Sequence, residues 1–137
     1  MNQAQATALL SAAIAIAEGY PLTHAIAWRA RNPGNLELPD QGFGLLAKKT
    51  IFESHLDGWT ALERQTWRIL TGEHSSYRPT MTLLEVAIRY TGHDHASEWA
   101  AIVAHITGLK PDDQIRNLLL LPPPHTLTEN PLAFPDP

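Results

Sequence analysis

The chain has no cysteine and few basic residues among its 137. Without cysteine, a disulfide framework, a thiolate zinc site and a cysteine nucleophile are all excluded. Its 10 Lys and Arg residues are scattered and are outnumbered by 14 Asp and Glu residues, so the net charge is -4. Because phosphate binding needs clustered basic side chains, we expect no nucleic-acid partner.

Several patterns with a known chemistry are also missing. There is no G-x-S-x-G nucleophile elbow and no Gly-rich phosphate loop after a strand, which disfavours serine hydrolase chemistry; we expect no cofactor. The apolar run from Ala8 to Ala17 is too short to span a bilayer, and no Lys or Arg precedes it as in a signal peptide. We therefore expect a helix of the mature protein and no membrane span, and the localisation stays open.

What the chain does contain is the composition of a soluble globular protein, with 44% hydrophobic and 18% charged residues. We expect a monomer with one domain over residues 1–121. The following segment, residues 122–137, is too rich in proline for a helix or strand and is predicted to be an extended or disordered tail.

Apolar periodicity, caps and stop residues predict a mainly α fold (α+β) of about five helices. The expected helices cover residues 4–18, 56–70, 83 to about 91, 96–107 and 111–119, the last opened by Pro111. The first is apolar on nearly every face, so it belongs in the middle of the domain. Between Gly19 and Ser54, NLEL and LLAKKTIFES flank the turn PDQGFG and predict a small β-hairpin lobe.

Glu18 stands at an unfavourable place, in the last turn of the first predicted helix before Gly19. The helix dipole is negative there and destabilises an ionised glutamate by roughly 0.3–1 kcal/mol. The apolar helix behind it, and the absence of Lys or Arg before Arg29, also favour the protonated form. Glycosidic cleavage requires such a neutral carboxylic acid, so Glu18 is a candidate general acid. The alternative is a solvated glutamate at a frayed helix end.

A second feature is the stretch ARNPGNLEL, residues 30–38. Asn32-Pro33-Gly34-Asn35 predicts a tight turn, in which Pro33 fixes φ and Gly34 is free to take positive φ. The turn delivers Asn35 at the start of a strand, where its amide can both donate to and accept from sugar hydroxyls and N-acetyl groups. The alternative is a surface turn with a self-capping Asn.

Several motifs follow one another in an order that resembles lysozyme-like peptidoglycan-cleaving proteins. They are Glu18-Gly19-Tyr20, Asn32-Pro33-Gly34-Asn35-Leu36, Ile51-Phe52-Glu53-Ser54 and Gly58-Trp59-Thr60-Ala61-Leu62. Similar sequences with an Asn-Pro-Gly-Asn motif occur in phage virion proteins and bacterial transglycosylase-like proteins. The resemblance covers about residues 8 to 110. It implies a lysozyme-like fold in which the glycan lies between the β lobe and the helices.

The resemblance also implies roles for single residues. Glu18 becomes the acid, Asn35 begins the wall of the lobe, and Asn32 in the same motif is a further substrate-binding candidate. Arg89-Tyr90-Thr91-Gly92-His93-Asp94 looks similar to a motif of glucosaminidase-type autolysins, which makes Tyr90 a candidate to pack on a sugar or to hydrogen-bond its N-acetyl group. A structural core tyrosine is the alternative. Arg31 before Asn32 departs from the commonest Asn-rich version of the motif.

A second carboxylate would decide the mechanism. Glu37 is the nearest candidate, because alternate residues of a strand face the same side and Asn35 would face the cleft; Asp40 and Glu53 are the others. A hydrolase needs one of them about 5–9.5 Å from the acid, whereas a lytic transglycosylase needs only the single acid. The resemblance implies cleavage of the MurNAc–GlcNAc β-1,4 bond in peptidoglycan strands as the expected function, and the lack of a marked second carboxylate gives a lean to the transglycosylase.

Two further interpretations stay beside this one. The rival function is a non-catalytic lysozyme-like structural or glycan-binding protein of the phage type. His93-Asp94-His95 has too few ligands at a known spacing for a metal site, so we expect no metal and a polar loop with a helix cap. The tryptophans at positions 28, 59, 67 and 99 are candidates to line a groove, although those at helical spacing are more often core.

Overall fold

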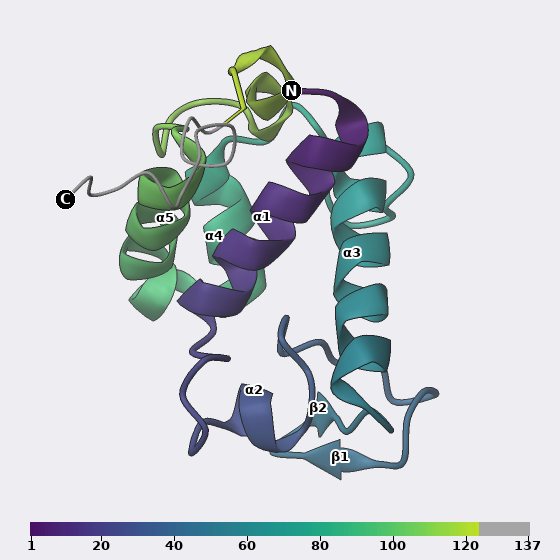
Figure 1. The fold of residues 1–137 in the computed structure, drawn as a ribbon. Helices are drawn as coiled ribbons and strands as arrows, with labels where there is room; N and C mark the ends of the chain where they lie inside the picture. Colours follow the sequence, from purple (N-terminus) through teal and green to yellow (C-terminus); the bar gives the residue numbers. More distant parts are fainter. Residues whose placement is uncertain (124–137) are drawn as a thin grey trace, which may run out of the picture.

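Helix α1 (Gln3–Ala17) is the central element of the fold in the computed structural model, which describes residues 1–123 (Figure 1). A reciprocal capping box between Asn2 and Gln5 starts it, and Glu18 is its C-cap residue. Its Ala, Leu and Ile side chains are buried on several faces, as expected for a helix inside a domain. It packs against α3 and α5. The prediction of a buried first helix is confirmed, with its bounds shifted by one residue.

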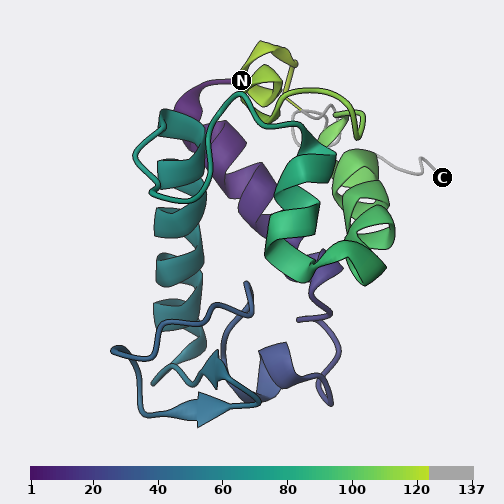
Figure 2. The same cartoon turned by 180° about the vertical axis from the view of Figure 1, so that it is seen from behind.

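The other described elements follow in a fixed order. They are α2 (Ile26–Arg29), β1 (Leu45–Leu46), β2 (Lys49–Thr50), α3 (His55–Thr71), α4 (Leu83–Thr91), α5 (His93–Thr107) and the 3-10 helix η1 (Ile115–Leu120). The two views show α3 on one side of α1 and the α4–α5 pair on the other (Figures 1 and 2). Residues 19–54, called the β lobe below, lie beyond the C-terminal end of α1. The α-rich fold class is thus confirmed, and the short α2 was not predicted.

The β lobe differs from its prediction. The hairpin lies within LLAKKT: Leu45 pairs with Thr50 and Leu46 with Lys49, and the two residues between them turn with positive φ. The segment NLEL, expected as the partner strand, forms no strand. Thr50 holds it instead, because Thr50 N–H donates to Leu36 O (2.9 Å) and Thr50 Oγ1 accepts from Leu38 N–H (2.7 Å). The predicted pairing across PDQGFG was therefore wrong.

The last predicted helix is also corrected. Pro111 opens no α-helix; residues 111–113 form a turn and a bend, Gln114 pairs with Thr82 in an isolated β-bridge, and the 3-10 helix η1 follows. The carbonyls of Pro111 and Asp113 accept hydrogen bonds from Leu84 and Leu83 in the first turn of α4. Those carbonyls are therefore not available to an α-helix starting at Pro111.

Helix α5 begins at His93, three residues before the predicted start at Ala96, so His93-Asp94-His95 is helical rather than a loop. Gly92, with φ of +85°, ends α4 and precedes α5. Within residues 1–123 no helix is both long and apolar enough to cross a membrane. Most of the predicted tail, residues 124–137, lies outside the described residues.

Candidate active site

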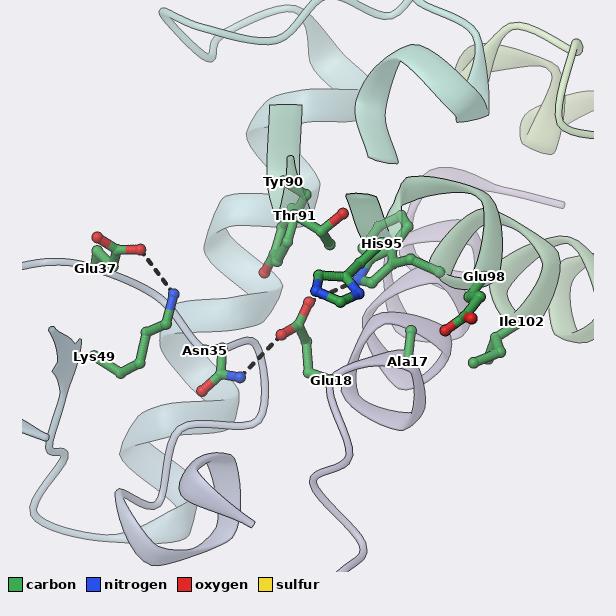
Figure 3. Close-up of a pocket in the computed structure, with 11 residues that line it drawn as sticks. Ala17, Glu18, Asn35, Glu37, Lys49, Tyr90, Thr91, His95, Glu98 and Ile102 are labelled. Atoms are coloured by element: carbon green, nitrogen blue, oxygen red, sulfur yellow. Dashed lines mark hydrogen bonds and ion pairs between the residues drawn. The ribbon is translucent and has the colours of Figure 1, made fainter. Parts of the chain in front are cut away.

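A pocket of about 570 Å3 lies where the end of α1, the β lobe, the end of α4 and the start of α5 meet (Figure 3). We call it the Glu18 pocket. Its lining residues are Ala17, Glu18, Asn35, Glu37, Lys49, Tyr90, Thr91, His95, Glu98, Trp99 and Ile102. The structure thus brings Glu18, Asn35, Glu37 and Tyr90 together, four of the five residues that the sequence singled out for the site.

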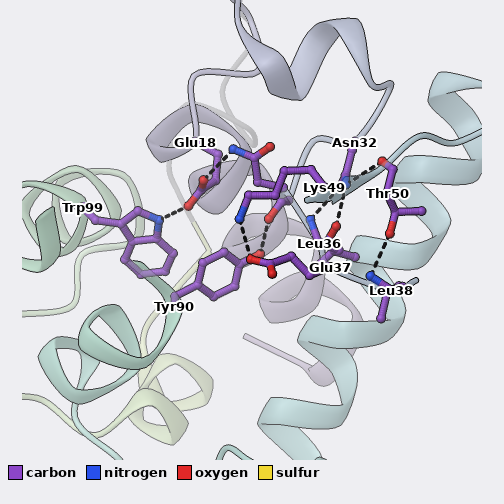
Figure 4. A network of polar contacts seen from close by, with 11 residues as sticks. Glu18, Asn32, Leu36, Glu37, Leu38, Lys49, Thr50, Tyr90 and Trp99 are labelled. Carbon is purple, nitrogen blue, oxygen red and sulfur yellow. Dashed lines mark hydrogen bonds and ion pairs between the residues drawn. The ribbon is translucent and has the colours of Figure 1, made fainter. Parts of the chain in front are cut away.

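Glu18 is fixed from two sides by hydrogen-bond donors (Figure 4). Asn35 Nδ2 donates to its Oε1 (2.9 Å) from the β lobe, and Trp99 Nε1 donates to its Oε2 (2.7 Å) from α5. The carboxyl group is therefore held in one orientation at the pocket rather than solvated at a frayed helix end.

The environment of Glu18 favours its protonated form. Burial raises the pKa of the carboxyl above its ordinary value of 4.5, while hydrogen bonds from Asn35 and Trp99 and the charge of Lys49 act in the opposite direction, and the net shift is upward. The position at the C-terminal end of α1 acts in the same direction as burial. A raised pKa is the property that a general acid needs at neutral pH.

The turn that presents Asn35 is held by Asn32. Asn32 is fully buried: its Nδ2 donates to Leu36 O and Thr50 O, each at 2.9 Å, and its Oδ1 accepts from Leu36 N–H. Every polar atom of this side chain bonds to backbone, and none lines the Glu18 pocket (Figure 4). The structure thus gives Asn32 a positioning role in place of the predicted contact with substrate.

Asn35 itself has φ of +50°, in the left-handed region where Asn is tolerated better than most residues. Its Oδ1 is buried without a hydrogen-bond partner among the described residues. The amide therefore has an unused acceptor beside the one donor that it offers to Glu18.

Tyr90, at the end of α4, faces the pocket with its ring but not with a free hydroxyl. The hydroxyl donates to Gly34 O (2.5 Å), and the ring centroid lies 5.0 Å from that of Trp99. Burial, followed by the negative charge of Glu18, raises the pKa of Tyr90 well above its ordinary value, so the hydroxyl remains a donor. Tyr90 thus ties α4 to the turn that carries Asn35; it packs against the core and also lines the pocket.

Glu37 lies on the β-lobe wall in an ion pair with Lys49 (Nζ to Oε2, 2.7 Å) (Figure 3). The sequence placed it on the same side as Asn35 by strand alternation, and both do line the pocket, although residues 35–38 form no strand. Its negative charge is compensated by a partner that also lines the pocket. Asp40 and Glu53, the other candidate second carboxylates, do not line it.

The opposite wall was missed by the sequence reasoning. It comes largely from α5, whose residues His95, Glu98, Trp99 and Ile102 recur at helical spacing on one face. Trp99 was considered mainly as a core residue; it is 3% exposed and also binds Glu18. The signal was present in the 3-4 spacing, but the helix was predicted to start too late to include His95.

Trp28, another tryptophan of interest, lies outside the pocket. Its ring stacks near His55 (centroids 4.4 Å apart) and near Tyr20, whose hydroxyl is hydrogen-bonded to His55 Nδ1 (2.7 Å). This cluster fixes the chain just after Glu18 against the start of α3. Within residues 1–123, no three His, Cys, Asp or Glu side chains are grouped as metal ligands.

Comparison of the chain with protein-family models, with curated proteins and with solved structures finds no match.

Proposed function

We propose that this protein is a lysozyme-like enzyme that cleaves the β-1,4 bond between N-acetylmuramic acid and N-acetylglucosamine in peptidoglycan, with Glu18 as the general acid. One observation carries the proposal: a largely buried carboxyl group with a raised pKa is oriented by two donors at a pocket between the β lobe and the helices. The order of motifs in the sequence supplies the substrate class.

The two hydrogen-bond donors distinguish the two oxygens of Glu18, of which one only accepts and the other carries the proton. An indole N–H can only donate, so Oε2 must remain an acceptor in both protonation states. The transferable proton therefore belongs on Oε1, on the side of Asn35. When Glu18 is ionised, Asn35 Nδ2 donates to Oε1; when it is protonated, the unpartnered Oδ1 can accept the proton after the amide turns over. Asn35 thus suits either state.

The other carboxylates of the pocket favour the transglycosylase over the hydrolase. Glu37 is bound by Lys49, and Glu98 lies on the α5 wall, apart from the Glu18 carboxyl (Figure 3). A nucleophile or water-activating base must instead reach the reacting carbon opposite the acid. A lytic transglycosylase has no such need.

In that reaction the proton of Glu18 Oε1 moves to the glycosidic oxygen as its bond to the muramic acid C1 breaks. The N-acetyl group of the sugar stabilises the positive charge at C1, and the sugar's own C6 hydroxyl then attacks C1. The proton of this hydroxyl returns to Glu18. The products are an anhydromuramic end and a free N-acetylglucosamine end, and no water is consumed.

The second candidate is a glycan-binding protein without turnover. It is favoured by the same two hydrogen bonds, since a carboxylate that accepts from both Asn35 and Trp99 is also a stable structural anchor. This protein would bind glycan strands in the same pocket and release no product.

Clearing of a peptidoglycan suspension separates the two candidates. We expect wild type to clear it and Glu18→Gln to lose at least about 100-fold in rate, the scale of a lost general acid. Glu98→Gln is the matched control, because it removes an exposed carboxylate from the same pocket, and it should clear at nearly the wild-type rate. Equal clearing by wild type and Glu18→Gln would refute the acid. Co-sedimentation of wild type with peptidoglycan and no clearing would establish the binding protein.

A further inference from the structure

Two further hollows lie behind the wall of the Glu18 pocket that the β lobe forms. Asn35 and Glu37 line that pocket, whereas Gln41, a few residues further on, lines two hollows against α3, and Leu38 lines the smaller of them. The hollows have volumes of about 280 and 50 Å3 and share Gln41 and other lining residues. We call them together the α3 groove. Figures 1 and 2 both show α3 beside the β lobe.

The smaller hollow is basic. Arg64 and Arg68 both line it, one helical turn apart on the same face of α3, and neither forms an ion pair within residues 1–123. Like charges at this spacing destabilise a helix, so an anion between them would be favourable. Gln65 lines the hollow as well; its Oε1 is hydrogen-bonded to His74 Nε2 (3.0 Å), which leaves its NH2 group as the free end. Guanidinium and amide donors around a small space suit a carboxylate.

The larger hollow carries charges of both signs. Arg64 lines it as well as the smaller hollow, and Glu53 and Asp57 line it together with Phe52 and Thr60. Neither carboxylate has an ion-pair partner in the described part of the chain. Asp57 is also favourable in the first turn of α3, but Glu53 has no such role in the helix. Two carboxylates beside an apolar side chain suit an amine carried on an aliphatic stem.

We propose that the α3 groove binds a short peptide by its free terminal carboxylate, at Arg64 and Arg68, and by a side-chain amine, at Glu53 and Asp57. The choice of peptide rests on the proposed function: the stem peptides of peptidoglycan carry both groups and are attached to the glycan. The segment from Asn35 to Gln41 separates the two sites, so glycan and peptide would bind on its two sides.

The test is a titration of the ¹⁵N-labelled full chain with the pentapeptide L-Ala-D-isoGlu-L-Lys-D-Ala-D-Ala. The Nε–H signals of Arg64 and Arg68 and the side-chain amide of Gln65 should shift. Amidation of the carboxyl terminus, or norleucine in place of lysine, should each weaken binding about tenfold, the loss expected for one charge-assisted contact. Arg64→Gln/Arg68→Gln should weaken it at least as much. Arg78→Gln, at an exposed arginine outside both hollows, should not.

The proposal would be overturned by no binding of the free-acid peptide to wild type, by equal binding of the amide, or by unchanged binding to the double Arg variant while its amide spectrum shows a folded protein. Inorganic phosphate is titrated separately, and if it shifts the same signals while lysine and norleucine peptides bind equally, the groove is only an anion site. The titration needs no glycan cleavage and can be repeated on Glu18→Gln. Loss of the acid role and loss of the peptide site are therefore distinguishable.

Discussion

At the scale of single residues, the site depends on what each partner of Glu18 can and cannot do. Trp99 can only donate, Asn35 can donate or accept, and Tyr90 uses its hydroxyl on Gly34 O to hold the turn beneath Asn35. Burial alone would raise the pKa of Glu18 further; the two donors limit that rise while they fix the orientation of the carboxyl. Proton donation and geometry are therefore set by the same contacts.

Trp99→Phe tests whether the hydrogen-bond donors limit the rise in the pKa of Glu18 that burial causes. The substitution removes a donor that lowers the pKa of Glu18 and keeps most of the apolar ring, so the pKa should rise. A general acid must be protonated to act, so the alkaline limb of the pH–rate profile should move to higher pH. We expect kcat to fall about tenfold, since the carboxyl loses one positioning hydrogen bond. Trp67→Phe, on the exposed side of α3, is the control. An alkaline limb that stays in place or moves to lower pH would contradict the assignment.

Tyr90→Phe separates the structural use of the hydroxyl from contact with a sugar. It leaves the buried Gly34 carbonyl without its donor, which should cost about 1–3 kcal/mol in the free energy of unfolding. Tyr77→Phe is the matched control, because the hydroxyl of Tyr77 donates no hydrogen bond within residues 1–123, and denaturant unfolding compares the two. If Tyr90→Phe kept full stability and lost only glycan affinity, the hydroxyl would be a substrate contact.

At the scale of elements, the sequence predicted those helices whose formation depends on contacts between residues close together in the chain. Helices α1, α3 and α4 were found from their periodicity, caps and glycine stops, because these features act within a few residues. The strand pairing inside the predicted β lobe and the 3-10 helix η1 were not, since their backbone groups bond to distant partners: Leu36 O to Thr50, and Asp113 O to Leu83. The site shows the same contrast between local and distant contacts. Glu18 and Asn35 were recognised from local sequence features, whereas the α5 wall was not, because tertiary packing brings it to Glu18.

Helix α3 approaches the turn before Asn35 so closely that position 58 must be a glycine. A Cβ there would lie 2.0 Å from Arg31 O and 2.9 Å from Pro33 Cδ. Alanine favours a helix by about 1 kcal/mol over glycine, but this clash with backbone outweighs the preference. We expect Gly58→Ala to destabilise the protein by about 1–3 kcal/mol in denaturant unfolding. Glu63→Ala, exposed on the same helix, should change stability by less than about 0.5 kcal/mol. A neutral or stabilising Gly58→Ala would show that the turn does not pack this closely.

At the scale of the whole molecule, Glu18 joins three parts of the chain. It ends the central helix α1, accepts a hydrogen bond from the β lobe through Asn35, and accepts another from α5 through Trp99. The pocket exists only where these parts meet, so the acid and the arrangement of the lobes depend on each other. A buried acid with a raised pKa also has a cost in stability, and that cost is measurable.

The pKa of Glu18 is higher in the folded protein than in the unfolded chain, so the folded state binds the proton more tightly. Stability from this group is therefore complete below the ordinary pKa of 4.5 and falls as pH rises through the folded pKa. Glu18→Gln should consequently raise the melting temperature at pH 7.5 more than at pH 4. The glutamine can accept from Trp99 and donate to the unpartnered Oδ1 of Asn35. Glu98→Gln should show no such pH-dependent gain. The raised pKa would be contradicted if the difference in melting temperature between Glu18→Gln and wild type were less favourable to the variant at pH 7.5 than at pH 4.

The most direct test of the central claim, that the proton of Glu18 drives glycan cleavage, is mass spectrometry of the products released from purified peptidoglycan. The wild-type protein is predicted to release muropeptides with anhydromuramic ends, and Glu18→Gln, folded and at equal concentration, is predicted to release none above background. Release of the same products at the same rate by Glu18→Gln, or no release by the wild-type protein, would contradict it.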